Sequence, residues 1–218
     1  MLKRGIEPIG AGSYKRVYPE AQNPEKKVVA EFRVQMPPEQ IKSLYYLGKI
    51  SHILFPDNIP NVYFAGNSHK TSNFRADREE LDEDHQLGNI IFLEDEDYFI
   101  RKSESPKLKK TDVEYIYDIT DKRNNNQVVR DFVDKAFSSG LYIDSGGQNF
   151  SFDANGQVKY LDLNPAWEYR KNLETDVLNF DPDLLLVTIN KISDSVKKDK
   201  ALIYFKRLMQ LIPKNLCP

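Results

Sequence analysis

The stretch Asp144-Ser-Gly-Gly-Gln-Asn149-Phe-Ser-Phe-Asp-Ala-Asn-Gly-Gln-Val-Lys-Tyr-Leu-Asp162 decides the fold of this chain. It holds an Asp, an Asn five residues later and a second Asp thirteen residues beyond that. Residues 149–152 and 157–161 alternate in polarity around the turn formers of 153–156, which predicts a strand, a turn and a strand. Such a hairpin places Asn149 and Asp162 side by side. These acceptors predict a phosphoryl-transfer site, with an ordinary surface hairpin as the alternative.

A second informative stretch, Ile9-Gly-Ala-Gly-Ser-Tyr-Lys-Arg-Val-Tyr18, lies near the start of the chain. Its two glycines let the backbone approach an anion and point N–H groups at it. No Gly-Lys-Ser or Gly-Lys-Thr follows, and no helical pattern begins there, which excludes a P-loop. The alternating residues after the glycines instead predict a hairpin that closes over phosphates.

Together the two stretches resemble a protein kinase-like fold. The resemblance covers the order of a glycine-rich loop, a strand at Lys27–Phe32, a helix at about 39–54 and the hairpin described above. It implies an α+β, bilobal structure with a β-rich N-lobe at 1–98 and a minimal, mainly helical C-lobe at 99–218, with nucleotide between the lobes. The junction is expected in the charged segment 94–105.

The lysines depart from the usual kinase pattern in an informative way. Lys15 replaces the third glycine of the usual loop, and Phe32 stands where the third strand usually carries a lysine. The segment is similar to the loop of the with-no-lysine kinases, which implies that Lys15 neutralises the phosphates. The alternative is a solvated strand lysine. The acidic helix residue that would pair with Lys15 is not identified. Glu39 is the only candidate, and it lies in the first turn of the helix, where the helix dipole alone favours an acidic residue.

The same resemblance implies roles for the rest of the site. Asp144 would orient or deprotonate an acceptor hydroxyl, while Asn149 and Asp162 would hold Mg²⁺. The residues expected to bind ATP belong to the loop and its strands: Gly10, Gly12, Ser13, Val17 and Ala30.

Other departures indicate a divergent enzyme. Tyr142 replaces the usual histidine, Asp162-Leu-Asn164 replaces Asp-Phe-Gly, and Gly146 stands where a phosphate-contacting lysine is usual. No Ala-Pro-Glu follows, so a long activation loop is not expected. The residues favour an ATP- and magnesium-dependent kinase that acts on a protein Ser/Thr, a small molecule or itself. A pseudokinase scaffold and an AMP transferase on the same fold are the rival interpretations.

Several further segments carry weaker expectations. Helical spacing at Val128, Phe132, Val133, Ala136 and Phe137 predicts a core helix that leads into the catalytic loop. Further C-lobe core is expected from 113–119, 184–192 and 201–212, with a helix start at Asp181-Pro182. The polar residues between Ser68 and Gly88 match no standard N-lobe strand and are interpreted as an exposed insertion. Trp167 would line a substrate cleft or pack in the core.

Composition limits the partners and the compartment. With 31 basic and 33 acidic residues the net charge is −2, which does not indicate nucleic-acid binding. Cys217 is the single cysteine, and the first residues lack the apolar stretch of a signal peptide. No membrane association is expected. The expected location is cytoplasmic, with secretion by a route that needs no cleaved signal left open. Oligomeric state has no signature in the sequence.

Overall fold

The computed structural model describes residues 5–11, 14–68, 71–79, 91–94, 99–101, 114–116, 127–144, 149–153, 155–170 and 174–216. The chain divides into two compact units: unit 1 joins Met1–Arg78 to Leu163–Pro218, and unit 2 is Glu79–Asp162. This division differs from the junction expected at 94–105, because the C-terminal residues group with the N-terminal ones. The lobe boundaries of the kinase-like interpretation stay a prediction.

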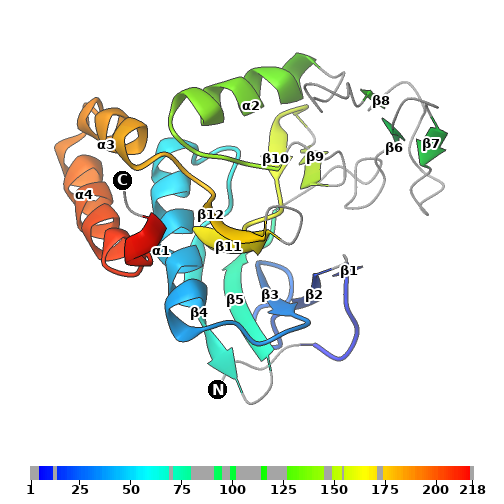
Figure 1. The fold of residues 1–218 in the computed structure, drawn as a ribbon. Coiled ribbons are helices and arrows are strands. Elements are labelled where there is room, and N and C mark those ends of the chain that lie inside the picture. Colours follow the sequence, from blue (N-terminus) through cyan, green and yellow to red (C-terminus); the bar gives the residue numbers. More distant parts are fainter. Residues whose placement is uncertain are drawn as a thin grey trace. The chain divides into compact units, whose positions relative to one another are not determined.

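The described residues form a mixed α/β structure. Unit 1 contains an antiparallel five-stranded sheet in the order β1-β2-β3-β5-β4 (Figure 1). Its strands are β1 (Gly10–Ala11), β2 (Lys15–Pro19), β3 (Lys27–Phe32), β4 (Val62–Ser68) and β5 (Thr71–Asp77). The strand predicted at Lys27–Phe32 is therefore confirmed.

Helix α1 (Pro38–Leu54) confirms the helix predicted at about 39–54. Proline at its first position suits a helix start, because the missing N–H would have no partner within the helix. The helix packs against β4 and against the later helix α4. Gly48 lies against Val62 of β4, which is opposed to Ala76 of β5, so α1 covers the face of the sheet that carries Ala76. Its buried stripe is apolar: Ile41, Leu44, Leu47 and Ile50.

The C-terminal part of unit 1 begins with a short hairpin of β11 (Trp167–Arg170) and β12 (Thr175–Leu178). Helix α3 (Pro182–Asn190) follows, and its N-terminus is capped because Asp181 Oδ1 accepts a hydrogen bond from the Leu184 N–H at 2.9 Å. The predicted helix start at Asp181-Pro182 is confirmed. Helix α4 (Ser195–Met209) packs on α3 and α1, and the 3₁₀ helix η3 (Lys214–Leu216) ends the described chain.

Unit 2 contains helix α2 (Gln127–Ser138) and a hairpin of β9 (Phe150–Phe152) and β10 (Val158–Tyr160). A separate sheet in the order β7-β6-β8 is formed by Phe99–Arg101, Ile91–Glu94 and Glu114–Ile116. The hairpin predicted from the motif is confirmed. None of the helices in the described ranges has both the length and the apolar composition that crossing a membrane requires.

Two expectations about burial were wrong. The segment interpreted as an exposed insertion contains β5, which lies between β3 and β4 and buries Ser72, Asn73 and Phe74. Residues 69–70 and 80–88 of that segment lie outside the described residues. In α2 the buried stripe is Val129, Phe132, Val133 and Ala136, whereas the predicted core residues Val128 and Phe137 are exposed.

Candidate functional site

Lys15, the expected phosphate lysine, is buried in β2. Its side-chain Nζ donates a hydrogen bond to the main-chain oxygen of Leu163 at 2.9 Å. The rings of Phe32 and Phe74 lie 5.7 and 5.6 Å from the same nitrogen, within the range of a cation–π contact. Lys15 is only 9% exposed, so the alternative of a solvated strand lysine is wrong.

The register of the sheet places the expected nucleotide-binding residues of β1–β3 on one face. Val17 is opposed to Gly10 on one side and to Ala30 on the other. Opposed residues of antiparallel strands have side chains on the same face, so these three share a row. Ala30 is buried and Val17 is half-buried. Gly12 and Ser13, also expected here, lie outside the described residues.

The acidic motif lies in unit 2, at the open end of the β9–β10 hairpin. The side-chain Nδ2 of Asn149 donates to the main-chain oxygen of Asp144 at 3.3 Å. The N–H of Leu161 donates to the main-chain oxygen of Asn149 at 2.9 Å, which puts the residue before Asp162 directly across from Asn149. Asn149 is buried, Asp162 half-buried and Asp144 exposed. Residues 145–148 lie outside the described residues.

The turn of this hairpin is stabilised by hydrogen bonds between residues close in the sequence. Asp153 Oδ1 accepts hydrogen bonds from the N–H groups of Asn155 and Gln157, both at 2.9 Å, and Gly156 adopts a φ of 75°. Burial alone would raise the pKa of Asp153, but these bonds and the charge of Lys159 outweigh it and lower the pKa below its ordinary value. An ionised Asp153 therefore stabilises the turn that aligns the two strands.

The donor set at the open end of the hairpin fits a hard divalent cation. Carboxylate and amide oxygens are ligands that Mg²⁺ accepts, and Mg²⁺ usually takes only one or two such protein groups beside phosphate and water. Asn149 and Asp162 supply that number. Within the part of the chain that the structure describes, no group of three or more His, Cys, Asp and Glu side chains is arranged to hold a metal on its own.

Two side chains of α1 hold the segment after Asp162 by hydrogen bonds to its main chain. The N–H of Ala166 donates to Ser43 Oγ at 2.9 Å, and Gln40 Nε2 donates to the Trp167 oxygen at 2.9 Å. Trp167 is half-buried in β11, and its indole Nε1 is shielded from solvent and makes no hydrogen bond to the described residues. Glu39, the one candidate helix partner of Lys15 that the sequence left open, is exposed in the first turn of α1.

The sequence alone did not indicate which residues hold the backbone of Asp144 and the segment after Asp162. The Asp144 N–H donates to the hydroxyl of Tyr160 at 3.3 Å, and Ser43 and Gln40 hold the segment that follows Asp162. Ser43 had one sequence signal, because it is a polar residue within the apolar stripe of a helix. Nothing in the local sequence distinguished Tyr160 from a core aromatic.

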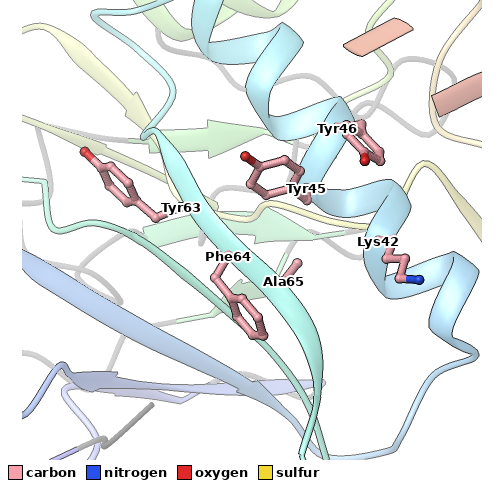
Figure 2. Close-up of a pocket in the computed structure, with 6 residues that line it drawn as sticks. All are labelled: Lys42, Tyr45, Tyr46, Tyr63, Phe64 and Ala65. Atoms are coloured by element: carbon pink, nitrogen blue, oxygen red, sulfur yellow. The ribbon is translucent and has the colours of Figure 1, made fainter. Parts of the chain in front are cut away.

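A pocket of about 260 Å³ lies elsewhere on unit 1, between α1 and the edge strand β4 (Figure 2). It is not lined by any of the residues expected to bind nucleotide. Its lining residues are Lys42, Tyr45, Tyr46, Tyr63, Phe64 and Ala65.

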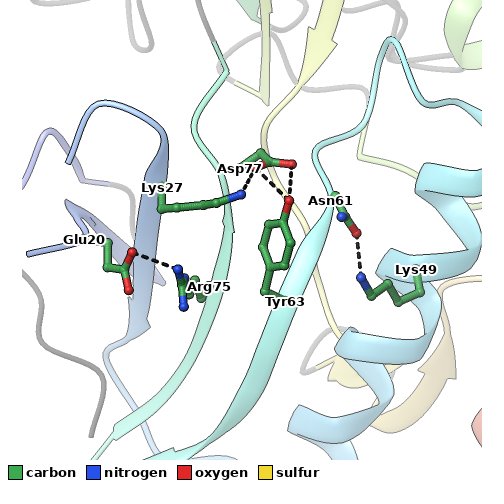
Figure 3. A network of polar contacts seen from close by, with 7 residues as sticks. All are labelled: Glu20, Lys27, Lys49, Asn61, Tyr63, Arg75 and Asp77. Atoms are coloured by element: carbon green, nitrogen blue, oxygen red, sulfur yellow. Dashed lines mark hydrogen bonds and ion pairs between the residues drawn. The ribbon is translucent and has the colours of Figure 1, made fainter. Parts of the chain in front are cut away.

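A polar network on the sheet has a structural role (Figure 3). Lys27 pairs with Asp77, whose two carboxylate oxygens also accept from the Tyr63 hydroxyl at 3.0 and 2.9 Å. Burial alone would lower the pKa of Lys27, but its bonds to Asp77 and Tyr63 raise it overall. Arg75 and the buried Glu20 form a second ion pair at 3.0 Å. These contacts join β3, β4, β5 and the residue that directly follows β2.

Comparisons with known proteins find only distant structural similarity. No family model matches the chain, and no curated protein is similar to it. Crystal structures of WbdD are distantly similar: one has a TM-score of 0.32 and 13% identity over 97% of this chain and 46% of that one. Another, of "the bifunctional kinase-methyltransferase WbdD", has a TM-score of 0.30 and 13% identity over 93% and 44%. The chain thus spans just under half the length of these proteins, and a likeness this distant supports no conclusion about fold or function.

Proposed function

We propose that this chain is an ATP- and magnesium-dependent phosphotransferase that moves the γ-phosphate to a hydroxyl of a protein Ser/Thr or of a small molecule. The observation that carries the proposal is the hydrogen bond from Lys15 to the carbonyl of Leu163. Leu163 is peptide-bonded to Asp162, so the cation of the glycine-rich segment lies at the backbone next to the expected metal ligand. Phosphoryl transfer needs such a cation beside the metal.

Lys15 does not have to give up this carbonyl to act. An ammonium group has three N–H donors, so one can remain on Leu163 while another bonds a phosphate oxygen. The face of the sheet carries Val17 and Ala30 in one row, which suits an adenine ring, and Gly10 lies at the edge of the same row. In this proposal Gly12 and Ser13 cover the phosphates.

Asp144 accepts the proton of the acceptor hydroxyl. The acceptor oxygen bonds to the γ-phosphorus as the bond from that phosphorus to the bridging oxygen of ADP breaks, and ADP leaves with the electron pair. Asn149 and Asp162 would hold the magnesium, which would neutralise charge on the phosphates when bound. The main-chain bonds of Asp144 to Asn149 and Tyr160 hold its backbone, and the residue is exposed.

One observation favours a rival function, a pseudokinase scaffold. Phe32, at the position of the usual third-strand lysine, is 2% exposed and belongs to the core. A scaffold needs no phosphate lysine. The position of Lys15 beside the segment that follows Asp162 favours the enzyme instead, because phosphoryl transfer uses a cation beside the metal.

The test is incubation of the chain with ATP, Mg²⁺ and candidate acceptors, followed by mass spectrometry. We expect an added phosphate with the natural chain and none with Asp144→Ala, while Asp144→Ala still binds nucleotide. Asp134→Ala, which removes an exposed carboxylate of α2, is the matched control and should transfer phosphate normally. An added AMP would replace the proposed reaction with nucleotidyl transfer, and equal loss of binding and transfer in Asp144→Ala would contradict its role.

A further inference from the structure

Helix α4 has two faces of different chemistry. Ala201 and Leu208 are fully buried, and the helix packs on α1 and α3 (Figure 1). Val196 and Ile203 are instead 62% and 52% exposed. At 3.6 residues per turn these two lie on one face, roughly 120–160° around the helix axis from the buried pair. They therefore do not belong to the core that α4 forms with its neighbours.

Basic side chains alternate with these two aliphatic ones. Lys200 follows Val196 by four residues, Arg207 follows Ile203 by four, and both basic residues are exposed. Residues three and four apart are neighbours on a helix surface, so all four form one row along α4. We call this row, Val196-Lys200-Ile203-Arg207, the α4 stripe. A single exposed aliphatic residue is ordinary, whereas a regular alternation of this kind has the form of a binding surface.

The surface around the α4 stripe is positively charged. The Asp194 carboxylate lies just before the helix, where it accepts the Lys197 N–H as a cap at 3.0 Å. Within α4 one acidic residue, Asp199, is exposed, together with four basic ones: Lys197, Lys200, Lys206 and Arg207. The whole chain has a net charge of −2, so this positive charge is local. A local positive field favours an acidic partner and speeds its association.

The spacing of the α4 stripe matches one side of a two-helix interface. In coiled coils, β-branched residues seven apart form an apolar seam, and charged residues four positions later pair with opposite charges on the partner. Val196 and Ile203 have the seam spacing, and Lys200 and Arg207 have the flanking one. We infer that the α4 stripe docks an acidic amphipathic helix of a partner protein, with apolar side chains on the two aliphatic residues and carboxylates on the two basic ones.

The length of the α4 stripe limits the strength of this contact. From Val196 to Arg207 the helix rises about 17 Å at 1.5 Å per residue. A contact of that length buries less than the roughly 1,200 Å² at which stable interfaces begin, so the partner binds transiently. We expect a dissociation constant that is about micromolar or weaker.

Two other classes of partner match the α4 stripe less well. A helix that lies in a membrane surface buries a broad apolar face in the lipid, whereas α4 packs its apolar face on α1 and α3. Nucleic-acid phosphates would engage Lys200 and Arg207 but would offer the two aliphatic side chains no apolar surface. An acidic amphipathic helix matches both kinds of side chain.

The test is titration of the full chain, without nucleotide, with two synthetic helical peptides of about three heptads each. Both carry leucine at the seam positions, and one carries glutamate and the other lysine at the flanking positions, so that neither pairs with itself. We expect the glutamate peptide to bind and to shift the amide NMR signals of residues 196–207. The lysine peptide should not bind.

Charge reversal on the α4 stripe provides the sharper measurement. Lys200→Glu combined with Arg207→Glu should weaken the glutamate peptide at least about tenfold and should allow the lysine peptide to bind. A variant that had only lost its structure would not gain a new partner. Lys26→Glu combined with Lys135→Glu makes the same charge change at two exposed positions outside α4, and it should leave both affinities as they are.

Several results would overturn the inference. They are equal affinity for the two peptides, no binding of the glutamate peptide at roughly 1 mM, an affinity that charge reversal leaves unchanged, and shifts confined to residues outside α4. Binding to phosphatidylserine vesicles or to a DNA duplex, with none to the glutamate peptide, would replace the partner with a lipid surface or a nucleic acid. Because no nucleotide is present, none of these outcomes depends on the proposed function.

Discussion

Lys15 of β2 lies directly opposite Phe32 of β3 in the antiparallel register. The two side chains therefore emerge on the same face of the sheet. Position 32, two residues after Ala30, is where the kinase-like pattern expects the phosphate lysine. Lys15 thus lies in the same row of the sheet as that position, one strand away, and its amino group bonds to the backbone next to Asp162.

This relationship predicts the effect of removing the cation. Lys15→Met should abolish phosphate transfer and lower the free energy of unfolding by about 1–3 kcal/mol, because the Leu163 carbonyl loses a buried donor. Urea unfolding and a transfer assay measure the two effects. Arg16→Met, an exposed change on the next residue, is the control. A Lys15→Met variant that transfers phosphate at the natural rate would rule out the assigned role.

The turn of the β9–β10 hairpin predicts a pH dependence. The folded-state pKa of Asp153 is lowered, so its contribution to stability is full above the unfolded pKa of about 3.9 and is lost as pH falls through the folded value. Asp153→Asn should cost about 1 kcal/mol near pH 6 and progressively less toward pH 2.

Urea unfolding at several pH values measures this difference. Asp183→Asn, at an exposed position in α3, controls for general charge effects. A difference between wild type and Asp153→Asn that stays constant from pH 6 to pH 2 would argue against the lowered pKa.

The close approach of α1 to β4 predicts that Gly48 does not tolerate a side chain. A Cβ at Gly48 would lie 2.8 Å from Cγ2 of the fully buried Val62. Gly48→Ala should lower the free energy of unfolding, because overpacking of about 1–3 kcal/mol exceeds the gain of about 1 kcal/mol in helix propensity.

Denaturant unfolding of Gly48→Ala, Val62→Ala and the double variant measures this effect as a double-mutant cycle. The double variant should be more stable than the sum of the single effects predicts, because Val62→Ala removes the clashing methyl group. Stabilisation by Gly48→Ala alone would show that the two elements are not in close contact.

Local patterns predicted the elements well. The stripe of α1 and the turn at 153–156 each encode their structure within a few residues, whereas the strand at Lys27–Phe32 was expected from the kinase-like resemblance. Strand β5 was missed because its buried residues include polar ones, whose hydrogen-bond partners lie outside the strand. Ser72 Oγ accepts from the Met36 N–H and donates to Asn67 Oδ1, both at 2.7 Å, and hydropathy does not register such pairing.

The site was predictable only in part, because one of its main contacts joins residues that are far apart in the sequence. The candidate residues Lys15, Asn149 and Asp162 could be identified from their motifs. The register that puts Val17 opposite Ala30 depends on the longer connection at 20–26, which the sequence does not define. The contact of Lys15 with Leu163 joins residues 148 positions apart, and no local pattern contains it. Val129 is buried and Val128 is exposed. Which of the two packs in the core depends on the rotation of α2 about its axis, and no local pattern defines that rotation.

The most direct test of the nucleotide site is thermal unfolding of the natural chain and of Asp162→Ala, each with and without Mg²⁺ and ATP. At about 100 times the dissociation constant, ligand adds roughly 2.7 kcal/mol, which raises the Tm of a chain of this size by about 5–10 °C. We predict a magnesium-dependent rise in the natural chain and in the control Asp183→Ala, and its loss in Asp162→Ala. No rise in the natural chain at millimolar ATP, or an equal rise in Asp162→Ala, would contradict the proposed site.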